Sequence, residues 1–390
     1  MTFWKTYKLE EVLDALIDYR GKTPKKTLSG IPLVTAKIVK NGFIQTPNEF
    51  IAEEDYDGWM TRGIPKIGDV VLTVEAPLGE VAQIKSTNIA LAQRIITLRG
   101  KKDILDNGFL KYFLQSDVGQ NRLKERETGT TVTGIKQSEL RLVEIDCPDI
   151  KTQSLISSIL SSLDNKIELN RQTNKTLEAI AQTLFKEMCL PKGEELPEGR
   201  RIGKLGKIIE INPKLALKKS AIAKYVEMRD LSEDSAIIKR YLDREFSSGS
   251  KFQNGDTLLA RITPCLENGK TGLVDLLEDN EVGWGSTEFI VLRGKKQVGF
   301  YFVYCLSRLQ SFRDFAIQSM VGSSGRQRVV DSILAEYELV IPSDKMLLEF
   351  HHLVKPIFEK IFINYKESQT LAAIRDSLLP KLMKGEIELN

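Results

Sequence analysis

The chain has 390 residues, of which 42% are hydrophobic and 28% charged, a composition typical of a globular protein and not of a disordered one. Its net charge of +3 is too small to indicate a nucleic-acid-binding protein by itself. The two histidines are adjacent and none of the four cysteines forms a CxxC pair, which argues against a zinc site.

The amino terminus gives no sign of export. The opening stretch MTFWKTYKLEEVLDAL has neither an apolar core segment nor a small-residue cleavage site, and no apolar run reaches the roughly 18 residues of a membrane span. We therefore expect a cytoplasmic protein without a membrane partner.

The first 150 residues predict a globular module of mixed helix and strand. Short β-branched runs such as GDVVLTV (68–74) and RIITLRG (94–100) predict strands, whereas residues 106–126 have helical spacing. Between Tyr19 and Asn48 six lysines and arginines occur without a single acid. Such a block is often merely a solvated face, so it gains weight only if it recurs.

Residues 151–190 predict one long helix, in which apolar residues recur at alternating steps of four and three. This spacing is typical of a coiled-coil seam, and asparagines in the middle of a seam commonly fix its register at some cost in stability. The predicted seam comprises Ile156, Leu160, Leu163, Ile167, Asn170, Asn174, Leu177 and Leu184.

A second module is predicted after a linker. Two prolines and two glycines at 190–201 indicate the linker. Residues 191–343 then combine predicted strands, such as EFIVLRG (288–294), with helical spacing at 299–320. The block from Phe289 to Arg313 again carries five basic residues and no acid.

Residues 344–390 predict a second long helix that repeats the first about 194 residues later. IFEKIFINYKESQTLAAIRDSLL (357–379) matches LDNKIELNRQTNKTLEAIAQTLF (163–185) in its pattern. We expect a kink or a late helix start near Pro356, because proline has no N–H to donate. The second seam comprises Val354, Ile357, Ile361, Asn364, Leu371 and Leu378.

These repeats predict an internal duplication. GDVVL (68–72) recurs as GDTLL (255–259), LRGKK (98–102) recurs intact at 292–296, and the run at 129–148 parallels that at 322–342. We predict a mixed α+β fold: two globular modules separated by two long helices that form an antiparallel coiled coil with pseudo-two-fold symmetry. A helix of ~38 residues spans ~57 Å, so the pair would act as a ruler between the modules. Alternatively, each helix packs on its own module alone.

No catalytic constellation is evident. LENGKTG (266–272) contains Gly-Lys-Thr, but a phosphate-binding loop requires glycine where Pro264 stands. There is no Asn-Pro-Pro-aromatic run of the kind that amino-methyltransferases use, no dinucleotide fingerprint, and no histidine placed for acid–base chemistry. The chain is predicted to be a binder with no metal and no cofactor of its own.

The order of these features resembles the specificity subunit of Type I restriction-modification enzymes, in which two target-recognition domains alternate with two helical spacers. The resemblance covers essentially the whole chain. Its most specific segments are ITPCLENGK (262–270) with GSTEF (285–289), TLEAIAQTLFKEM (176–188) and DSLLPKLMKGEIEL (376–389).

The resemblance implies four parts: target-recognition domain 1 (1–150), a central spacer helix (151–190), target-recognition domain 2 (191–343) and a C-terminal spacer helix (344–390). Each domain would read one half-site of a bipartite, asymmetric double-stranded DNA target. The helices would dock two methyltransferase subunits, and restriction subunits would join them. S-adenosylmethionine, ATP and Mg²⁺ are expected on those partner subunits, not on this chain.

Charge and loop position suggest which residues contact DNA, since lysine and arginine contacts to phosphates supply much of the affinity of such proteins. Lys270 has the alternative of a role in the module scaffold. The predicted contacts are Arg20, Lys22, Lys25, Lys26, Lys136 and Gln137 in the first module, and Lys218, Lys219, Arg229, Lys270, Arg326, Gln327 and Arg328 in the second.

Two other functions stay open at this point. One is a structural adaptor, with two protein-binding modules on a coiled-coil rod, and the other is an enzyme whose site has no recognisable motif. A steep fall of DNA affinity with salt distinguishes DNA recognition from the adaptor, because protein-binding modules have no reason to release many counterions from DNA.

Overall fold

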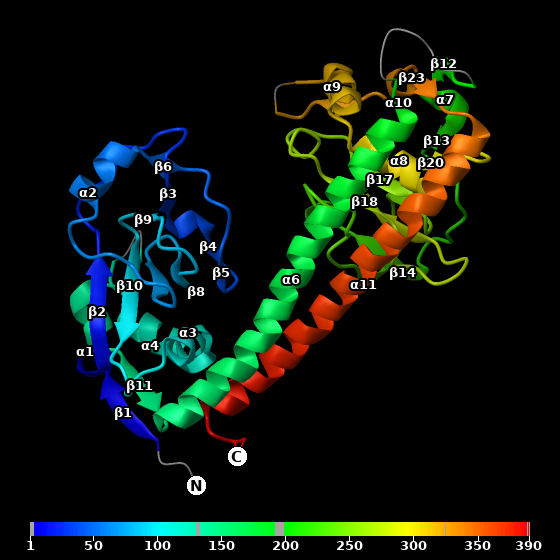
Figure 1. The fold of residues 1–390 in the computed structure, drawn as a ribbon. Coiled ribbons are helices and arrows are strands. Elements are labelled where there is room, and N and C mark those ends of the chain that lie inside the picture. The colour runs from blue at the N-terminus through cyan, green and yellow to red at the C-terminus, as the bar shows by residue number, and fades with distance from the viewer. Residues whose placement is uncertain (1–3, 130–132, 192–198, 324, 388, 390) are drawn as a thin grey trace. The chain divides into compact units, whose positions relative to one another are not determined.

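The computed structural model describes residues 4–129, 133–191, 199–323, 325–387 and 389 (Figure 1). The chain divides into two compact units: unit 1 comprises residues 1–167 and 370–390, and unit 2 comprises residues 168–369. Both long helices therefore contribute to both units. The four-part division inferred from the sequence stays a prediction, and residues 192–198 of the predicted linker lie outside the described part of the chain.

Unit 1 is built on an antiparallel four-stranded sheet in the order β2-β10-β7-β8, with a smaller sheet, β6-β3-β9, beside it in the module. Strands β1 and β11 pair next to the long helices, and β4 pairs with β5. The bounds of the strands are β1 Lys5–Lys8, β2 Leu13–Asp18, β3 Ile31–Val34, β4 Val39–Lys40, β5 Phe43–Ile44, β6 Phe50–Ile51, β7 Val70–Val74, β8 Leu78–Gln83, β9 Ala90–Leu91, β10 Ile95–Gly100 and β11 Glu144–Cys147; those of the helices are α1 Leu9–Val12, α2 Tyr56–Trp59, α3 Asn107–Gln115, α4 Asp117–Glu125 and α5 Gln137–Arg141.

Unit 2 repeats this plan. Its main sheet has the order β13-β20-β17-β18, and its second sheet, β15-β14-β19-β16, has one strand more than its counterpart. The bounds of the strands are β12 Arg201–Lys204, β13 Ile209–Ile211, β14 Ile222–Val226, β15 Leu242–Glu245, β16 Ser250–Phe252, β17 Thr257–Ala260, β18 Thr271–Leu273, β19 Gly283–Gly285, β20 Phe289–Gly294, β21 Met320–Val321, β22 Arg328–Val329 and β23 Glu338–Ile341; those of the helices are α7 Leu205–Ile208, α8 Phe300–Ser307, α9 Gln310–Gln318 and α10 Asp331–Leu334.

One ion pair explains two of the sequence repeats. Asp69, from the first GD motif, accepts from Nε and Nη2 of Arg99, from the first LRG motif, at 2.8 and 2.7 Å. In unit 2 Asp256 accepts from Nε and Nη2 of Arg293, both at 2.7 Å. Both carboxylates are buried, so each pair fastens the start of one central strand to the end of its neighbour.

The long helices are α6 (Ile150–Cys189) and α11 (Asp344–Met383), each of 40 residues. Within unit 2, Asn170 contacts Ser368 and Asn174 contacts Ile361, so the two helices run antiparallel there. The predicted α+β fold with paired long helices is confirmed.

Of the two alternatives expected near Pro356, a late start of the second helix is wrong, and a kink stays a prediction. The helix begins at Asp344, where the Ser343 hydroxyl accepts from the N–H of Met346. Proline removes a single helical hydrogen bond, and this loss is offset by the burial of Phe350, Val354 and neighbouring residues in the core of unit 2.

Each core takes in parts of both helices. In unit 1, Ile156 and Leu160 of α6 and Leu382 and Met383 of α11 are buried with α3 and the main sheet. In unit 2, Phe185 of α6 packs with residues of α8 and α11. The helices therefore pair with each other and also pack on the modules, which combines the two arrangements weighed from the sequence.

The packing on the modules broadens the buried face beyond a two-helix seam. Of the predicted seam positions, Ile156, Leu160, Asn170, Val354, Ile361 and Asn364 are buried, and Leu163, Ile167, Asn174, Leu177, Leu184, Ile357, Leu371 and Leu378 are partly buried. Additional buried positions face the modules, among them Asp164, Glu178, Phe185 and Phe358.

Asp164 joins a module to both helices within unit 1. Its carboxylate accepts from Lys111 Nζ at 2.7 Å, Tyr112 Oη at 2.8 Å and Arg375 Nη1 at 2.8 Å. Burial alone would raise the pKa of Asp164, but the Lys111 ammonium and these hydrogen bonds lower it. The Asp164 carboxylate of α6 thus binds a cation from α3, Lys111, and a cation from α11, Arg375.

Candidate nucleic-acid interface

A short basic turn recurs at the same place in both modules. In unit 1 it lies between β2 and β3, where the N–H of Thr27 donates to the carbonyl of Phe50 at 2.9 Å. In unit 2 it lies between β13 and β14, where the N–H of Ser220 donates to the carbonyl of Phe246 at 2.9 Å. Two lysines directly precede each of these residues, Lys25 and Lys26 in unit 1, and Lys218 and Lys219 in unit 2.

The lysines of these turns extend into solvent. Lys22, Lys25, Lys26, Lys218 and Lys219 are all exposed. Lys26 forms an ion pair with Glu49 at 2.9 Å, whereas the other four have no ion pair with any residue that the structure describes. A hydrated, flexible ammonium group of this kind suits contact with a phosphate.

Arg20, the first residue of the block, is bound to the module itself. Its guanidinium donates to both carboxylate oxygens of Asp18 and, from Nη1, to the carbonyl of Ile135 at 2.8 Å. The contact with Ile135 brings the first basic loop next to the turn that carries Lys136 and Gln137, so the structure unites the two segments predicted for this module. Lys136 is exposed at the start of α5, and Gln137 is partly buried.

In the second module the predicted arginines lie in two places: Arg229 follows β14, and Arg326 and Arg328 lie at β22. Arg229 is exposed and paired with Glu227, and Arg326 is exposed in the turn before β22. Arg328 makes a two-pronged contact with Glu288 at 2.7–3.0 Å, and this hydrogen bonding lowers the pKa of the Glu288 carboxyl.

Two further predicted residues contact the scaffold. Lys270 Nζ donates to the carbonyl of Met228 at 3.1 Å, which agrees with the scaffold alternative. Gln327 is partly buried, and its carbonyl accepts from the N–H of Thr263 at 3.2 Å.

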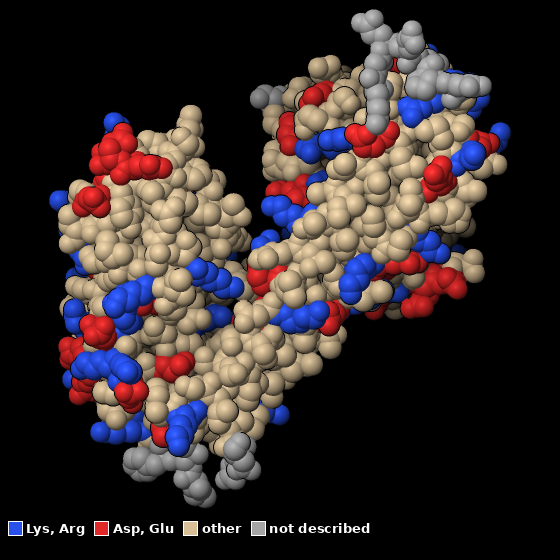
Figure 2. Space-filling model, in the orientation of Figure 1, with Lys and Arg blue, Asp and Glu red and all other residues tan. Residues whose placement is uncertain are grey.

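Charge alone does not mark an interface on the face of the protein shown in Figure 2. Blue and red side chains are interspersed on both units. The repeated turn was missed in the sequence because the loops around it differ, although the shared pattern Lys-Lys-Thr or Lys-Lys-Ser would have revealed it.

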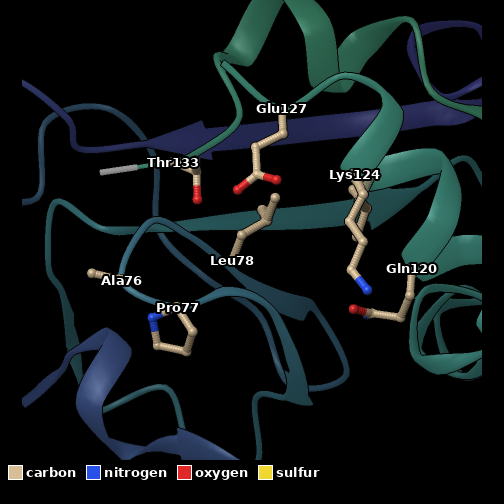
Figure 3. A pocket seen from close by; sticks show the side chains of 8 residues that line it. Ala76, Pro77, Leu78, Gln120, Lys124, Glu127 and Thr133 are labelled. Carbon is tan, nitrogen blue, oxygen red and sulfur yellow. The ribbon is translucent and has the colours of Figure 1, made fainter. Parts of the chain in front are cut away.

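A hollow of about 410 Å³ lies in unit 1, between Ala76–Leu78 and α4 (Figure 3). Lys124 and Gln120 line one side of it, and Glu127 and Thr133 another. One base, one acid and several apolar groups provide neither a metal site nor a patch of one charge. Among the described residues no cluster of His, Cys, Asp or Glu could hold a metal ion, and no described helix has both the length and the apolar character needed to cross a bilayer.

The sequence is similar to those of known proteins. The family model of the type I restriction modification DNA specificity domain matches residues 1–179. The type I restriction enzyme MjaIX specificity subunit of Methanocaldococcus jannaschii is 26% identical over 422 residues, covering 99% of this chain and 94% of that protein. The HindI specificity subunit of Haemophilus influenzae is 23% identical over 472 residues, covering 99% of this chain and all of that protein.

The fold is also shared with a solved structure. The crystal structure of the type I restriction-modification system S subunit from M. genitalium matches with a TM-score of 0.57 and 18% identity, covering 100% of this chain and 97% of that one. Both curated relatives are named as specificity subunits and align along almost their whole length. Residues 1–179 therefore match the DNA specificity domain of type I restriction-modification enzymes, and the chain as a whole is similar to specificity subunits of such enzymes.

Proposed function

We propose that this chain selects the DNA target of a type I restriction-modification complex and that each module reads one half-site of a bipartite sequence. The observation that carries the proposal is the basic turn that recurs in both modules, anchored in each by the same backbone hydrogen bond. Lysines on such turns contact phosphates and orient a module, while neighbouring side chains read base edges.

The two half-sites should differ in sequence. The loops around the turns, GKTPKKTLSG (21–30) and NPKLALKKSA (212–221), have few residues in common. The second sheet of unit 2 also has the additional strand β16. Two modules with the same framework and different loops favour an asymmetric target.

The long helices offer equivalent apolar positions for two copies of a partner. Leu169 and Ile180 of α6 are exposed, as are Ile363 and Ile374 of α11. Each residue of the first pair corresponds to one of the second after the 194-residue offset that relates Asn170 to Asn364. We propose two methyltransferase subunits as the occupants, with restriction subunits joining that assembly. S-adenosylmethionine, ATP and Mg²⁺ would reside on those partners.

The test is to co-express the chain with its methyltransferase subunit and to map methylated adenines in the host DNA by single-molecule sequencing. A motif of two unlike half-sites with a fixed unread gap is expected. A stable complex that methylates no defined sequence would contradict the proposal and favour the adaptor function.

The participation of the basic turn of unit 2 in DNA binding has its own test. Lys218→Ala and Lys219→Ala together should weaken binding to the target that the map identifies. If the two lysines together have no effect on DNA affinity at any salt concentration, the turn of unit 2 is not part of the interface.

A further inference from the structure

Two aliphatic side chains protrude from the basic turns. Leu28 is 100% exposed and Ile222 is 77% exposed, the two highest values among the large hydrophobic residues that the structure describes. Leu28 is the first residue after Thr27, and Ile222 is the second after Ser220. In both modules an exposed apolar group thus lies within two residues of the residue that anchors the turn, beside a lysine pair, although the two positions are not equivalent.

The turn in unit 1 holds Leu28 in place. The Thr27 N–H is bonded to Phe50, and its hydroxyl donates to the carbonyl of Ser29 at 2.7 Å. Gly30 has φ +125° and lies against the Ile51 carbonyl, where an added Cβ would approach to 2.3 Å. The backbone is therefore held in place on both sides of Leu28, and this backbone conformation points the Leu28 side chain into solvent.

The turn in unit 2 is fixed in a similar way. The N–H of Ala221 donates to the carbonyl of Lys218 at 3.1 Å, and the N–H of Phe246 donates to the carbonyl of Ala221 at 2.8 Å. Ile222 is the first residue of β14 and lies opposite Glu245 of β15. Its side chain alternates with that of Ala223, which is buried.

Single exposed apolar residues are common and need no function by themselves. Here the two most exposed cases both lie within two residues of an anchored basic turn, one in each module, next to lysines that suit phosphate contact. DNA presents apolar surface to a protein beside its phosphates in two forms, the C5-methyl group of thymine and the face of an unstacked base.

We propose that Leu28 and Ile222 each contact the apolar surface of a base, one in each half-site, and thereby contribute to sequence selection. The inference rests on the proposed function. It assigns apolar readout to two residues that carry no charge and no hydrogen-bonding group on their side chains.

The experiment uses the complex of the full chain with its methyltransferase subunit and the duplex that the methylation map identifies. Affinity for this duplex and for a scrambled duplex is measured across a salt series for Leu28→Ala and Ile222→Ala. Each variant should bind the target about tenfold more weakly or worse, as for the loss of one base contact. Affinity for the scrambled duplex and the salt dependence should not change, because no charge is altered.

Matched controls are available in each unit. Ile67 and Ile202 are 69% and 68% exposed and lie outside the two turns, so Ile67→Ala and Ile202→Ala should bind both duplexes like the unmodified chain. Unchanged target preference in both turn variants, or an equal loss in the controls, would overturn the inference. If the unmodified complex prefers no sequence at all, the proposed function itself fails.

Chemically modified duplexes distinguish contact with a thymine methyl group from contact with an unstacked base. Replacing thymine by uracil in one half-site removes the methyl group, and should abolish the difference between the unmodified chain and the variant for that half-site if the methyl is the contact. A 2-aminopurine placed in the half-site should brighten on binding of the unmodified complex, and less so with the variant, if a base is unstacked.

Discussion

Asn170 of α6 donates from its side-chain amide to the backbone carbonyl of Asn364 of α11, at 3.3 Å, and these two residues occupy the same position of the duplicated helix. Asn364 in turn donates to Asn174 Oδ1 at 2.8 Å. Contact between equivalent residues is what antiparallel helices make about a local two-fold axis. The polar centre of the seam therefore fixes how far one helix is shifted along the other.

Asn170→Ala should loosen the helix pair in unit 2. The change removes the amide that contacts Glu367 and Ser368 at 2.8 and 3.2 Å, and the loss of one hydrogen bond costs about 0.5–1.5 kcal/mol. Hydrogen exchange of amides in the middle of α6 should be about tenfold faster. Lys175→Ala, at an exposed position of the same helix, serves as the control, and equal exchange in both variants would contradict the role of the polar centre.

Asp69→Ala should destabilise the main sheet of unit 1. It leaves the Arg99 guanidinium, which is 16% exposed, without its two-pronged partner, and breaking a buried pair by removing one partner costs about 3 kcal/mol or more. The measurement is hydrogen exchange in β7 and β10. Glu54→Ala removes an exposed acid and should leave exchange unchanged; similar protection in both variants would show that the repeated motif is dispensable for the fold.

Glu178 should make unit 2 less stable as pH rises. Burial raises the pKa of this carboxyl, although the N–H of Ala236 and the hydroxyl of Tyr304 donate to it. An acid whose pKa is higher in the folded state stabilises the fold below its unfolded pKa of about 4.3, and this contribution is lost as pH rises through the folded pKa.

Glu178→Gln removes the titration and keeps the shape. The variant should equal the unmodified chain near pH 4 and become the more stable of the two as pH increases, in thermal unfolding followed across a pH series. Parallel pH profiles for the two proteins would show that the carboxyl is not shifted upward.

Lys25→Ala and Lys218→Ala should each reduce the salt dependence of DNA binding. Loss of one phosphate contact lowers the slope of log affinity against log salt by about 0.9, for target and scrambled duplexes alike. Lys175→Ala, which removes an exposed lysine of α6, is the control for total charge. A slope that falls equally in all three variants would indicate a general effect of charge and no contact by the turns.

The length of the helices should set the unread gap of the target. Four residues added to both α6 and α11 lengthen each by about 6 Å, which corresponds to roughly one to two base pairs. Methylation mapping of the lengthened protein should return the same half-sites with a wider gap. An active, folded protein that keeps the original gap would refute the ruler.

The duplication could be predicted because its evidence is local. The repeated GD and LRG motifs and the matching heptads are visible as letters, and the pairs Asp69–Arg99 and Asp256–Arg293 show why these letters recur. Helix periodicity also predicted the buried positions Ile156, Leu160 and Asn170, since burial on one helix face leaves a regular trace. The late helix start that Pro356 suggested is wrong, because burial of the surrounding residues in the core outweighs the loss of one helical hydrogen bond.

The candidate site was only partly accessible to such reasoning. Charge selected Lys25 and Lys218, which are exposed, and equally Arg20 and Lys270, which are bound to their own modules. A lysine or arginine has the same letter whether it faces solvent or a carbonyl of its own module. Nothing local distinguished Leu28 and Ile222 from core residues.

The sequence by itself therefore determined the duplicated plan, the two long helices and the resemblance to type I specificity subunits, because periodicity and repeated motifs can be recognised in the order of the residues. The tertiary structure decided which basic groups are free, which helix positions face a module, and that two unlike loops present equivalent turns. Those properties depend on contacts between segments distant in the chain, such as Thr27 with Phe50 and Ser220 with Phe246, and such contacts leave no periodic signal in the sequence.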